Sequence, residues 1–219
     1  MAKSSLWSGR RALLWLVPAL SLGCASVLGL PDREVDPTFT DEADAGDAGD
    51  VGDGGTDLPA CVDYCTQVTK SCVGPNTVYA SQAVCLAICA TLPPGSPEKP
   101  TGNTLACRAD QARLAGTTGE VKLYCPPAGP GGGSGEDGGA PLCGSNCDGY
   151  CSLMAAICPG SFPTLGACMD TCSSVPDVGG YNIAQTDGNT IQCRLYHVSA
   201  ATQASEVHCP HALGAMHCL

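Results

Sequence analysis

The spacing of apolar and polar positions after residue 60 predicts helices. Cys61, Cys65 and Cys72 lie at i, i+4 and i+11, and this spacing places all three side chains on one face of a helix. The residues between them include neither glycine nor proline. We therefore expect a first helix that buries its cysteine face.

Two further segments have the boundaries of helices. Residues 81–90 begin with Ser81, a good N-cap residue, and residues 103–116 begin with an Asn-Thr pair and end at Gly116. The pattern returns later in the chain, at residues 147–158, 165–174 and 189–204. The expected fold class is mainly α.

The cysteines after residue 60 form two sets of eight in the same order. The first set comprises Cys61, Cys65, Cys72, Cys85, Cys89, Cys107, Cys125 and Cys143, and the second comprises Cys147, Cys151, Cys158, Cys168, Cys172, Cys193, Cys209 and Cys218. Both sets open with gaps of three and six residues, and the later gaps differ by insertions. Matching patterns of this kind indicate an internal repeat.

Residues beside the cysteines match as well. Tyr64 corresponds to Tyr150, and the tract GNTLACR at 102–108 corresponds to GNTIQCR at 188–194. A Cys-Pro pair also recurs, as Cys125-Pro126 and Cys209-Pro210. We interpret the chain as a small disulfide-rich helical module of about three short helices, duplicated in tandem.

Composition explains why such a module needs cysteines. Aromatic residues make up 5% of the chain, and both tryptophans, Trp7 and Trp15, precede the repeats. A small domain that lacks large apolar side chains usually needs covalent or metal staples to fold. Seventeen cysteines supply candidates for such staples, at a density that favours an oxidising compartment.

Negative charge is concentrated before the repeats. The net charge is −11, and residues 31–60 hold ten acidic side chains and one arginine. Nucleic acid is an improbable partner, because phosphate binding needs a basic surface. Residues 24–60 have the composition of an acidic disordered tether. Their regularly spaced aspartates lack the terminal bidentate glutamate of a calcium loop.

The N-terminal residues have the pattern of an export signal. Lys3, Arg10 and Arg11 precede the apolar run 12–20, which is too short to span a bilayer. Residues 20–25, Leu-Ser-Leu-Gly-Cys-Ala, resemble the lipobox of bacterial lipoproteins, with serine where that family usually has leucine. The resemblance implies cleavage before Cys24 and lipidation of its thiol with diacylglycerol and palmitate.

In bacterial lipoproteins, the residue after the lipidated cysteine helps to determine which membrane retains the protein. Ala25 stands there rather than aspartate, which by resemblance to Gram-negative lipoproteins implies the outer membrane. The alternative is an ordinary secretory peptide cut nearby, which would leave Cys24 as a spare thiol. The expected organisation is a signal peptide at 1–23, a tether at 24–60, repeat 1 at 61–143 with a Gly-rich loop at 128–141, and repeat 2 at 144–219.

The paired Cys-x3-Cys helices resemble the twin hairpins of small intermembrane-space chaperones. The antiparallel hairpin of that family implies the pairs Cys61–Cys89, Cys65–Cys85, Cys147–Cys172 and Cys151–Cys168. One arrangement of the remaining cysteines is Cys72–Cys107, Cys125–Cys143, Cys158–Cys193 and Cys209–Cys218. Spacing alone does not decide these, because eight cysteines allow 105 pairings. The extra Cys72 and Cys158 depart from the family, so its chaperone function does not carry over.

A second resemblance concerns the recurring Gly-Asn-Thr-x-x-Cys-Arg tract and the His-Cys-Pro-His tract at 208–211. Together these are similar to cysteine-rich lipoproteins that recur in myxobacteria. The resemblance covers about residues 61–219. It supports the class of protein and implies no activity.

The histidines are the main candidates for chemistry. All four lie in repeat 2, at His197, His208, His211 and His217, and could ligate zinc or copper. The first three align with Gln111, Tyr124 and Pro127 of repeat 1, so a metal site would be unique to repeat 2. The cysteines beside them have counterparts in repeat 1, which favours disulfides over metal ligands and leaves no cofactor as the expectation.

Enzymatic motifs are weak in this sequence. Cys-x3-Cys differs from the Cys-x2-Cys of thioredoxin-like redox sites, and the chain contains no nucleophile elbow or phosphate loop. Asp187 lies before the third helix of repeat 2, which argues against a dyad with His197. Arg108 and Arg194 recur after a matching cysteine, and we expect them to stabilise the fold.

These observations predict a non-enzymatic lipoprotein of the cell envelope with a structural or protein-binding role. Its expected partners are the membrane, through the lipid, and an unidentified protein. The alternative is a metal-binding or redox lipoprotein that uses the histidine and cysteine cluster of repeat 2.

Overall fold

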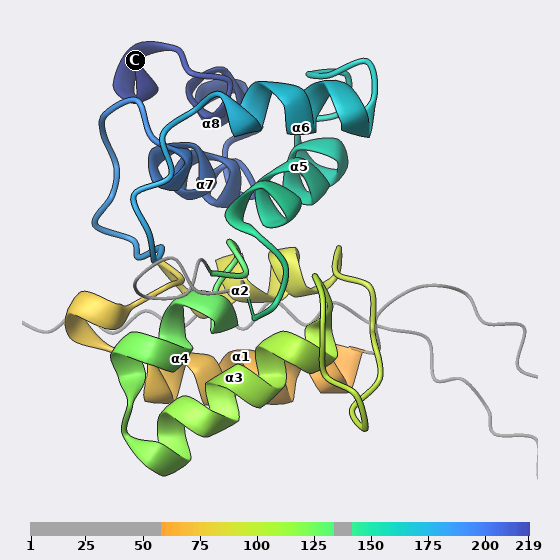
Figure 1. Ribbon diagram of the computed structural model, residues 1–219, viewed down its shortest axis with the longest axis vertical. Coiled ribbons are helices and arrows are strands. Elements are labelled where there is room, and N and C mark those ends of the chain that lie inside the picture. Colours follow the sequence, from red (N-terminus) through yellow and green to blue (C-terminus); the bar gives the residue numbers. More distant parts are fainter. Residues whose placement is uncertain (1–57, 134–141) are drawn as a thin grey trace, which may run out of the picture. The chain divides into compact units, whose positions relative to one another are not determined.

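The computed structural model describes residues 58–133 and 142–219, in which helices are joined by loops and turns (Figure 1). Repeat 1 contains α1 (Leu58–Ser71), α2 (Gln82–Cys89), α3 (Leu105–Thr118) and α4 (Val121–Ala128), with the 3-10 turn η1 (Gly74–Asn76) after α1. Repeat 2 contains α5 (Asn146–Ile157), α6 (Leu165–Ser173), α7 (Ile191–Ala200) and α8 (Ser205–Ala212), followed by η3 (Met216–Cys218). The described ranges hold no strand, which confirms the expected mainly α class.

Each repeat contains one helix more than the three expected. The additional helices are α4 and α8, and both include the proline that follows a cysteine, Pro126 in one and Pro210 in the other. Proline removes a backbone donor and disfavours the interior of a helix, so these segments do not look helical in sequence. Each of these helices has only eight residues, and packing on α3 or α7 compensates for the missing bond.

Side-chain caps fix where the helices begin. Ser81 accepts a hydrogen bond from the backbone of Val84 at 3.2 Å, as its predicted role as an N-cap requires. Thr104 and Thr190 cap α3 and α7 in the same way. Short polar residues therefore set the starts of α2, α3 and α7, whereas α4 and α8 begin without a side-chain cap.

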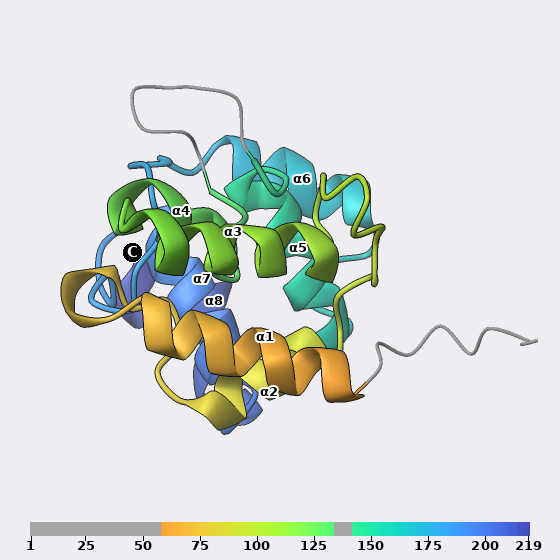
Figure 2. The same ribbon diagram turned by 90° about the horizontal axis from the view of Figure 1, so that it is seen from below.

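The predicted end of the third helix at Gly116 is wrong. The helix continues to Thr118 and ends at Gly119, whose φ of +78° suits glycine. Gly116 instead faces α1, because a β-carbon there would lie 2.6 Å from side-chain atoms of Gln67 and Ser71. A residue that resembles a helix terminator thus permits two helices to approach closely (Figure 2).

Two disulfides link the paired helices within each of the two helical hairpins. In repeat 1 the bonds Cys61–Cys89 and Cys65–Cys85 join α1 to α2. In repeat 2 the bonds Cys147–Cys172 and Cys151–Cys168 join α5 to α6. These are the pairs that the resemblance to antiparallel twin-cysteine hairpins implies.

The other four pairings differ from the arrangement considered above. The structure contains no Cys72–Cys107, Cys125–Cys143, Cys158–Cys193 or Cys209–Cys218 bond among the residues it describes. It forms instead the bonds Cys72–Cys125, Cys107–Cys143, Cys158–Cys209 and Cys193–Cys218. The additional helices are the reason, because α4 and α8 bring the seventh cysteine of each set to the end of the first helix. The two sets thus share one order of pairing, which agrees with the predicted duplication.

The Gly-rich segment is only partly a surface loop. Residues 129–133 are buried, and a β-carbon at Gly131 would lie 2.5 Å from the side-chain oxygen of Asn146. The expected loop at 128–141 is therefore wrong at its beginning, since Ala128 ends α4 and the next residues pack against repeat 2. Residues 134–141 lie outside the described ranges.

Buried side chains from both repeats belong to one continuous core. Asn103 of repeat 1 donates hydrogen bonds to the Asp148 carbonyl and to the Ser152 hydroxyl, at 3.2 and 2.9 Å. The backbone of Ile183 donates to the Thr77 carbonyl at 2.9 Å. The repeats are therefore two halves of one packed body.

The N-terminal predictions fall mostly on residues outside the described ranges. The signal peptide at 1–23, Cys24 and residues 24–57 of the tether are in this class. The expected tether boundary at residue 60 is slightly too late, because α1 begins at Leu58. Among the described helices, none has the length and apolar character needed to cross a membrane.

Candidate functional site

The tract that the repeats share serves the fold. Gly102 and Gly188 have φ values of +72° and +91°, and each precedes the threonine cap of the next helix by two residues. Arg108 is fully buried and donates to the carbonyl of Pro127 in the last turn of α4 and to those of Gly129 and Pro130 just after it. The shared residues thus cap helices and bind carbonyls, as expected for Arg108.

The matched tyrosines have an equivalent role. Tyr64 donates to the carbonyl of Ala128, the last residue of α4. Tyr150 donates to the carbonyl of Ala212, the last residue of α8, at 2.9 Å. Both hydroxyls satisfy the C-terminus of the fourth helix of their repeat. The residues shared by the two repeats thus have structural roles, and the histidines are residues in which the repeats differ.

The structure brings the four histidines of repeat 2 together. His197 extends from α7, His208 and His211 extend from α8, and His217 lies in η3. The ring centroid of His197 is 5.3 Å from that of His208, 4.8 Å from that of His211 and 5.6 Å from that of His217. His197 thus contacts the other three imidazoles, where α7 packs against α8 and the C-terminal turn.

A backbone carbonyl fixes the tautomer of His197. Its Nε2 lies 3.2 Å from the carbonyl oxygen of Thr186, which can only accept a hydrogen bond, so the proton of the neutral ring is on Nε2. The lone pair of Nδ1 then faces Nδ1 of His208 at 3.0 Å. The sequence does not signal this carbonyl, because the contact depends on how residues 174–190 fold back over α7.

His211 and His217 differ in their surroundings. His211 is buried, and its Nδ1 has no hydrogen-bond partner. His217 is exposed, and its Nδ1 lies 2.8 Å from a carboxylate oxygen of Asp187, to which it donates a hydrogen bond. The aspartate weighed as a partner of His197 therefore orients His217.

Burial favours neutral rings at the centre of the cluster. Desolvation lowers the pKa of His197, and the nearby histidines lower it further against the opposing effect of the Thr186 hydrogen bond. Desolvation also lowers the pKa of His208, together with repulsion from His211 and His217. Both rings therefore present unprotonated nitrogens near neutral pH, which is the form that binds metal ions.

The cysteines beside the cluster form a disulfide. The sulfur atoms of Cys193 and Cys218 and a ring nitrogen of His197 lie within 4.8 Å of one another. The two sulfurs are bonded to each other, whereas a metal ion binds the thiolate form. In this oxidised state the nitrogens of His197, His208 and His211, which also lie within 4.8 Å of one another, are the available ligands.

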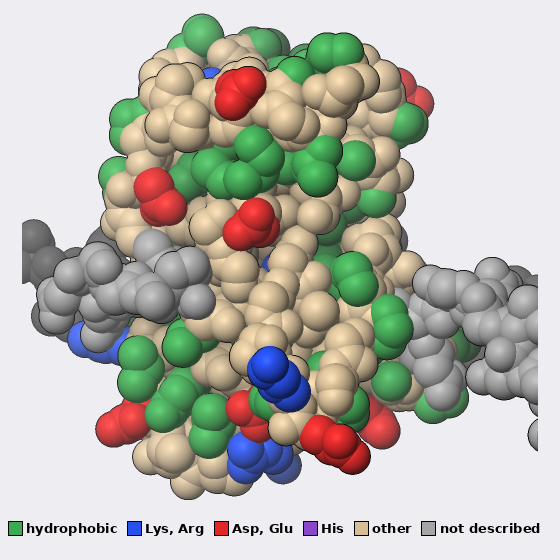
Figure 3. All heavy atoms as spheres, turned by 45° about the vertical axis from the view of Figure 1, so that its right-hand side comes forward, with side chains coloured by type: hydrophobic (Ala, Val, Ile, Leu, Met, Phe, Trp, Pro, Cys, Tyr) green, Lys and Arg blue, Asp and Glu red, His purple; other side chains and the backbone are tan. Residues whose placement is uncertain are grey.

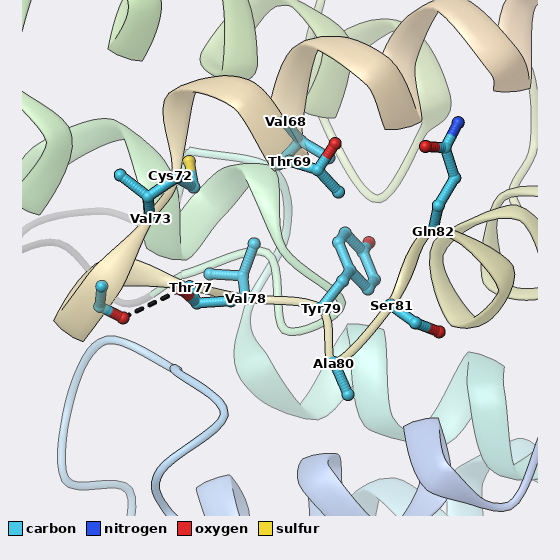
Figure 4. A pocket seen from close by; sticks show the side chains of 11 residues that line it. Val68, Thr69, Cys72, Val73, Thr77, Val78, Tyr79, Ala80, Ser81 and Gln82 are labelled. Carbon is cyan, nitrogen blue, oxygen red and sulfur yellow. Dashed lines mark hydrogen bonds between the residues drawn. The ribbon is translucent and has the colours of Figure 1, made fainter. Parts of the chain in front are cut away.

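Two surface hollows differ in the side chains that line them. One, of about 470 Å³, lies between η1 and the start of α2 and is lined by side chains such as Val68, Thr69 and Tyr79 (Figure 4). It contains hydroxyl and amide groups but no carboxylate or histidine among its lining residues. Another, of about 250 Å³, is lined by Tyr79, Tyr181 and Tyr196, with His208 beside them. One histidine of the cluster, His208, therefore lies at the edge of a mostly apolar hollow.

The fold and its cysteines define a disulfide-rich helical protein. Residues 56–137 match the family model of the BfoA family C-terminal domain. The match spans most of repeat 1 and ends before Cys143, so it does not include the histidine cluster. No curated protein and no solved structure matches the chain.

Proposed function

We propose that this protein is an exported lipoprotein, anchored by Cys24 in the outer membrane, with a non-enzymatic structural or protein-binding role. The myxobacterial-type cysteine-rich lipoproteins are the class that its sequence resembles. The disulfide-stapled pair of repeats forms the rigid body, and the acidic segment before α1 is the tether.

One observation carries this proposal. The chain has seventeen cysteines, and the described residues place sixteen of them in eight disulfides. Cys24 is the one cysteine that remains, and it lies at the cleavage position of the lipobox-like segment. Lipidation gives this thiol a function, and eight disulfides suit an exported protein.

Surface chemistry supports a binding role better than catalysis. On the face drawn in Figure 3, apolar side chains gather in a band across the upper part, acidic side chains are scattered over the face, and basic side chains lie mostly in its lower part. Such a surface suits contact with another protein more than with an anionic polymer. Within the shared tract, the two threonines cap helices, Arg108 donates to backbone carbonyls, and the cysteines form disulfides.

The anchor is tested by Cys24→Ala in the full chain, expressed in a Gram-negative host. We expect the wild-type protein to fractionate with membranes and to incorporate radiolabelled palmitate, and the variant to lose both properties. Ala25→Asp is the matched control, and it should keep the label but move the protein toward the inner membrane. A Cys24→Ala variant that remains membrane-bound contradicts the proposal.

A second function, the binding of a metal ion, is favoured by the convergence of His197, His208 and His211. Its test is the metal content of the protein as isolated from cells without a histidine tag. We expect about one equivalent of zinc or copper, reduced in His208→Gln. Protein isolated with no bound metal contradicts a metal-binding function.

A further inference from the structure

We infer that His197, His208 and His211 form a binding site for one divalent first-row transition-metal ion, Cu²⁺ or Zn²⁺, positioned by the Thr186–Asp187 segment. This inference deepens the second proposed function and does not depend on a lipid anchor. It names the ligands, the class of ion and the residues that orient the ligands.

The first ligand is prepared before any ion arrives. Because the Thr186 carbonyl holds the proton of His197 on Nε2, the Nδ1 lone pair faces the centre of the cluster. Metal-bound histidines commonly donate their second nitrogen to a backbone carbonyl or a carboxylate in this way. His197 has this arrangement at 3.2 Å.

The second ligand lies at a suitable distance. Nδ1 of His208 is 3.0 Å from Nδ1 of His197. A tetrahedral ion with bonds of about 2.0–2.1 Å needs ligand atoms about 3.3 Å apart. A small outward movement of His208 therefore admits an ion in place of the shared hydrogen bond, while the proton on Nδ1 of His208 moves to Nε2 of the same ring.

The third ligand supplies an independent reason for an ion. His211 is buried, and its Nδ1 has no hydrogen-bond partner. Buried polar atoms in native proteins almost always have a partner, so an unpartnered nitrogen beside two other imidazoles indicates a missing one. Binding an ion at the centre of the three rings gives this histidine an interaction that the protein alone does not provide.

His217 lies beside the three ligands without belonging to their group. Its ring centroid is 4.9 Å from that of His211, and Asp187 holds its Nδ1 at 2.8 Å. Nε2 of His217 is then left for a metal or solvent. Two adjacent residues, Thr186 and Asp187, thereby orient two different histidines.

The donor set determines the class of ion. Imidazole nitrogens suit Cu²⁺ and Zn²⁺, whereas Mg²⁺ and Ca²⁺ require oxygen ligands. His208 is partly exposed and lines a surface hollow, so this ligand is in reach of an ion from solvent. The cluster is therefore a nitrogen-rich site for a transition metal.

The test uses the full chain, purified in mild detergent without a histidine tag and with its disulfides intact. The protein is treated with EDTA and titrated with Cu²⁺, Zn²⁺ and Mg²⁺ by calorimetry. We expect one Cu²⁺ or Zn²⁺ per chain and no binding of Mg²⁺. His197→Gln and His208→Gln should each weaken binding by more than about 100-fold, and Asp187→Asn by about 10-fold.

Gln111→Ala is the matched control, because Gln111 occupies the aligned position in repeat 1, and it should bind as the wild type does. Electron paramagnetic resonance of the Cu²⁺ form gives a readout that does not depend on variants, and should show nitrogen couplings from at least three imidazoles. Unchanged binding in both histidine variants, or a Cu²⁺ spectrum without several nitrogens, would overturn the inference. Metal found in the isolated protein but held elsewhere refutes this ligand set while leaving a metal-binding function in place.

Discussion

The two repeats have the same frame but different chemistry at one position in the fold. Both have four helices, the same order of disulfides, a threonine cap on the third helix and a tyrosine on the C-terminus of the fourth. Repeat 1 has Gln111, Tyr124 and Pro127 where repeat 2 has three histidines. The disulfides and caps stabilise the frame, and so leave these positions free to differ.

Repeat 1 cannot form the same site with its own residues. Gln111 is buried with an unpartnered side-chain oxygen, and Pro127 has no ligand atom in its side chain. The residue before the last cysteine is Leu142 in repeat 1 and His217 in repeat 2. The comparison teaches that the four-helix, four-disulfide frame does not require the histidines, because repeat 1 has the same frame without them.

The largest expected effect comes from the disulfide that closes each frame. Replacing Cys72 and Cys125 together by alanine should lower the free energy of unfolding by about 4 kcal/mol, because the bond closes a loop of more than 50 residues. The double replacement of Cys158 and Cys209 should cost a similar amount. Guanidinium unfolding monitored by circular dichroism measures both values. A clear difference between them would break the equivalence of the repeats.

Replacing the two buried arginines should change the free energy of unfolding by less than losing a disulfide, and by different amounts. Arg108→Met should cost about 3 kcal/mol, because it leaves carbonyls of the Pro127–Pro130 segment without a donor. Arg194→Met should cost about 1 kcal/mol, since its contact with Asn189 is long, at 3.5 Å. The same unfolding measurement applies, and equal losses would contradict the asymmetry. Exposed Arg113→Met serves as the control and should change stability little.

The smallest effect concerns pH and occurs only in repeat 2. Folding lowers the pKa of His197 and His208, so the unfolded chain binds protons near pH 6.5 while the folded chain remains neutral at these rings. Stability should therefore fall as pH falls below about 6.5, until the folded-state pKa values are reached. Melting temperatures in EDTA between pH 7.5 and 5 test this. His197→Gln should flatten the profile, and an unchanged slope would show that other groups cause it.

Local sequence patterns predicted much of the fold. The i, i+4 spacing of Cys61 and Cys65, together with the cap at Ser81, indicated helices that the structure contains. Helix propensity did not predict α4 and α8, because Pro126 and Pro210 disfavour a helix. Packing against α3 and α7 compensates for the backbone hydrogen bond that each proline removes. The pairs Cys72–Cys107 and Cys158–Cys193, considered from the sequence, are wrong for the same reason, because α4 and α8 bring Cys125 and Cys209 to these cysteines instead.

The sequence by itself determined the class of helical, disulfide-rich protein, the eight-cysteine order and the presence of all four histidines in repeat 2. These properties depend on residue type and local spacing, which can be read directly from the sequence. Only the tertiary structure decided which distant cysteines pair, that the Thr186 carbonyl fixes the tautomer of His197, and that Asp187 binds His217. Such contacts join residues far apart in sequence, and their geometry is set by the packing of α7, α8 and the C-terminal turn.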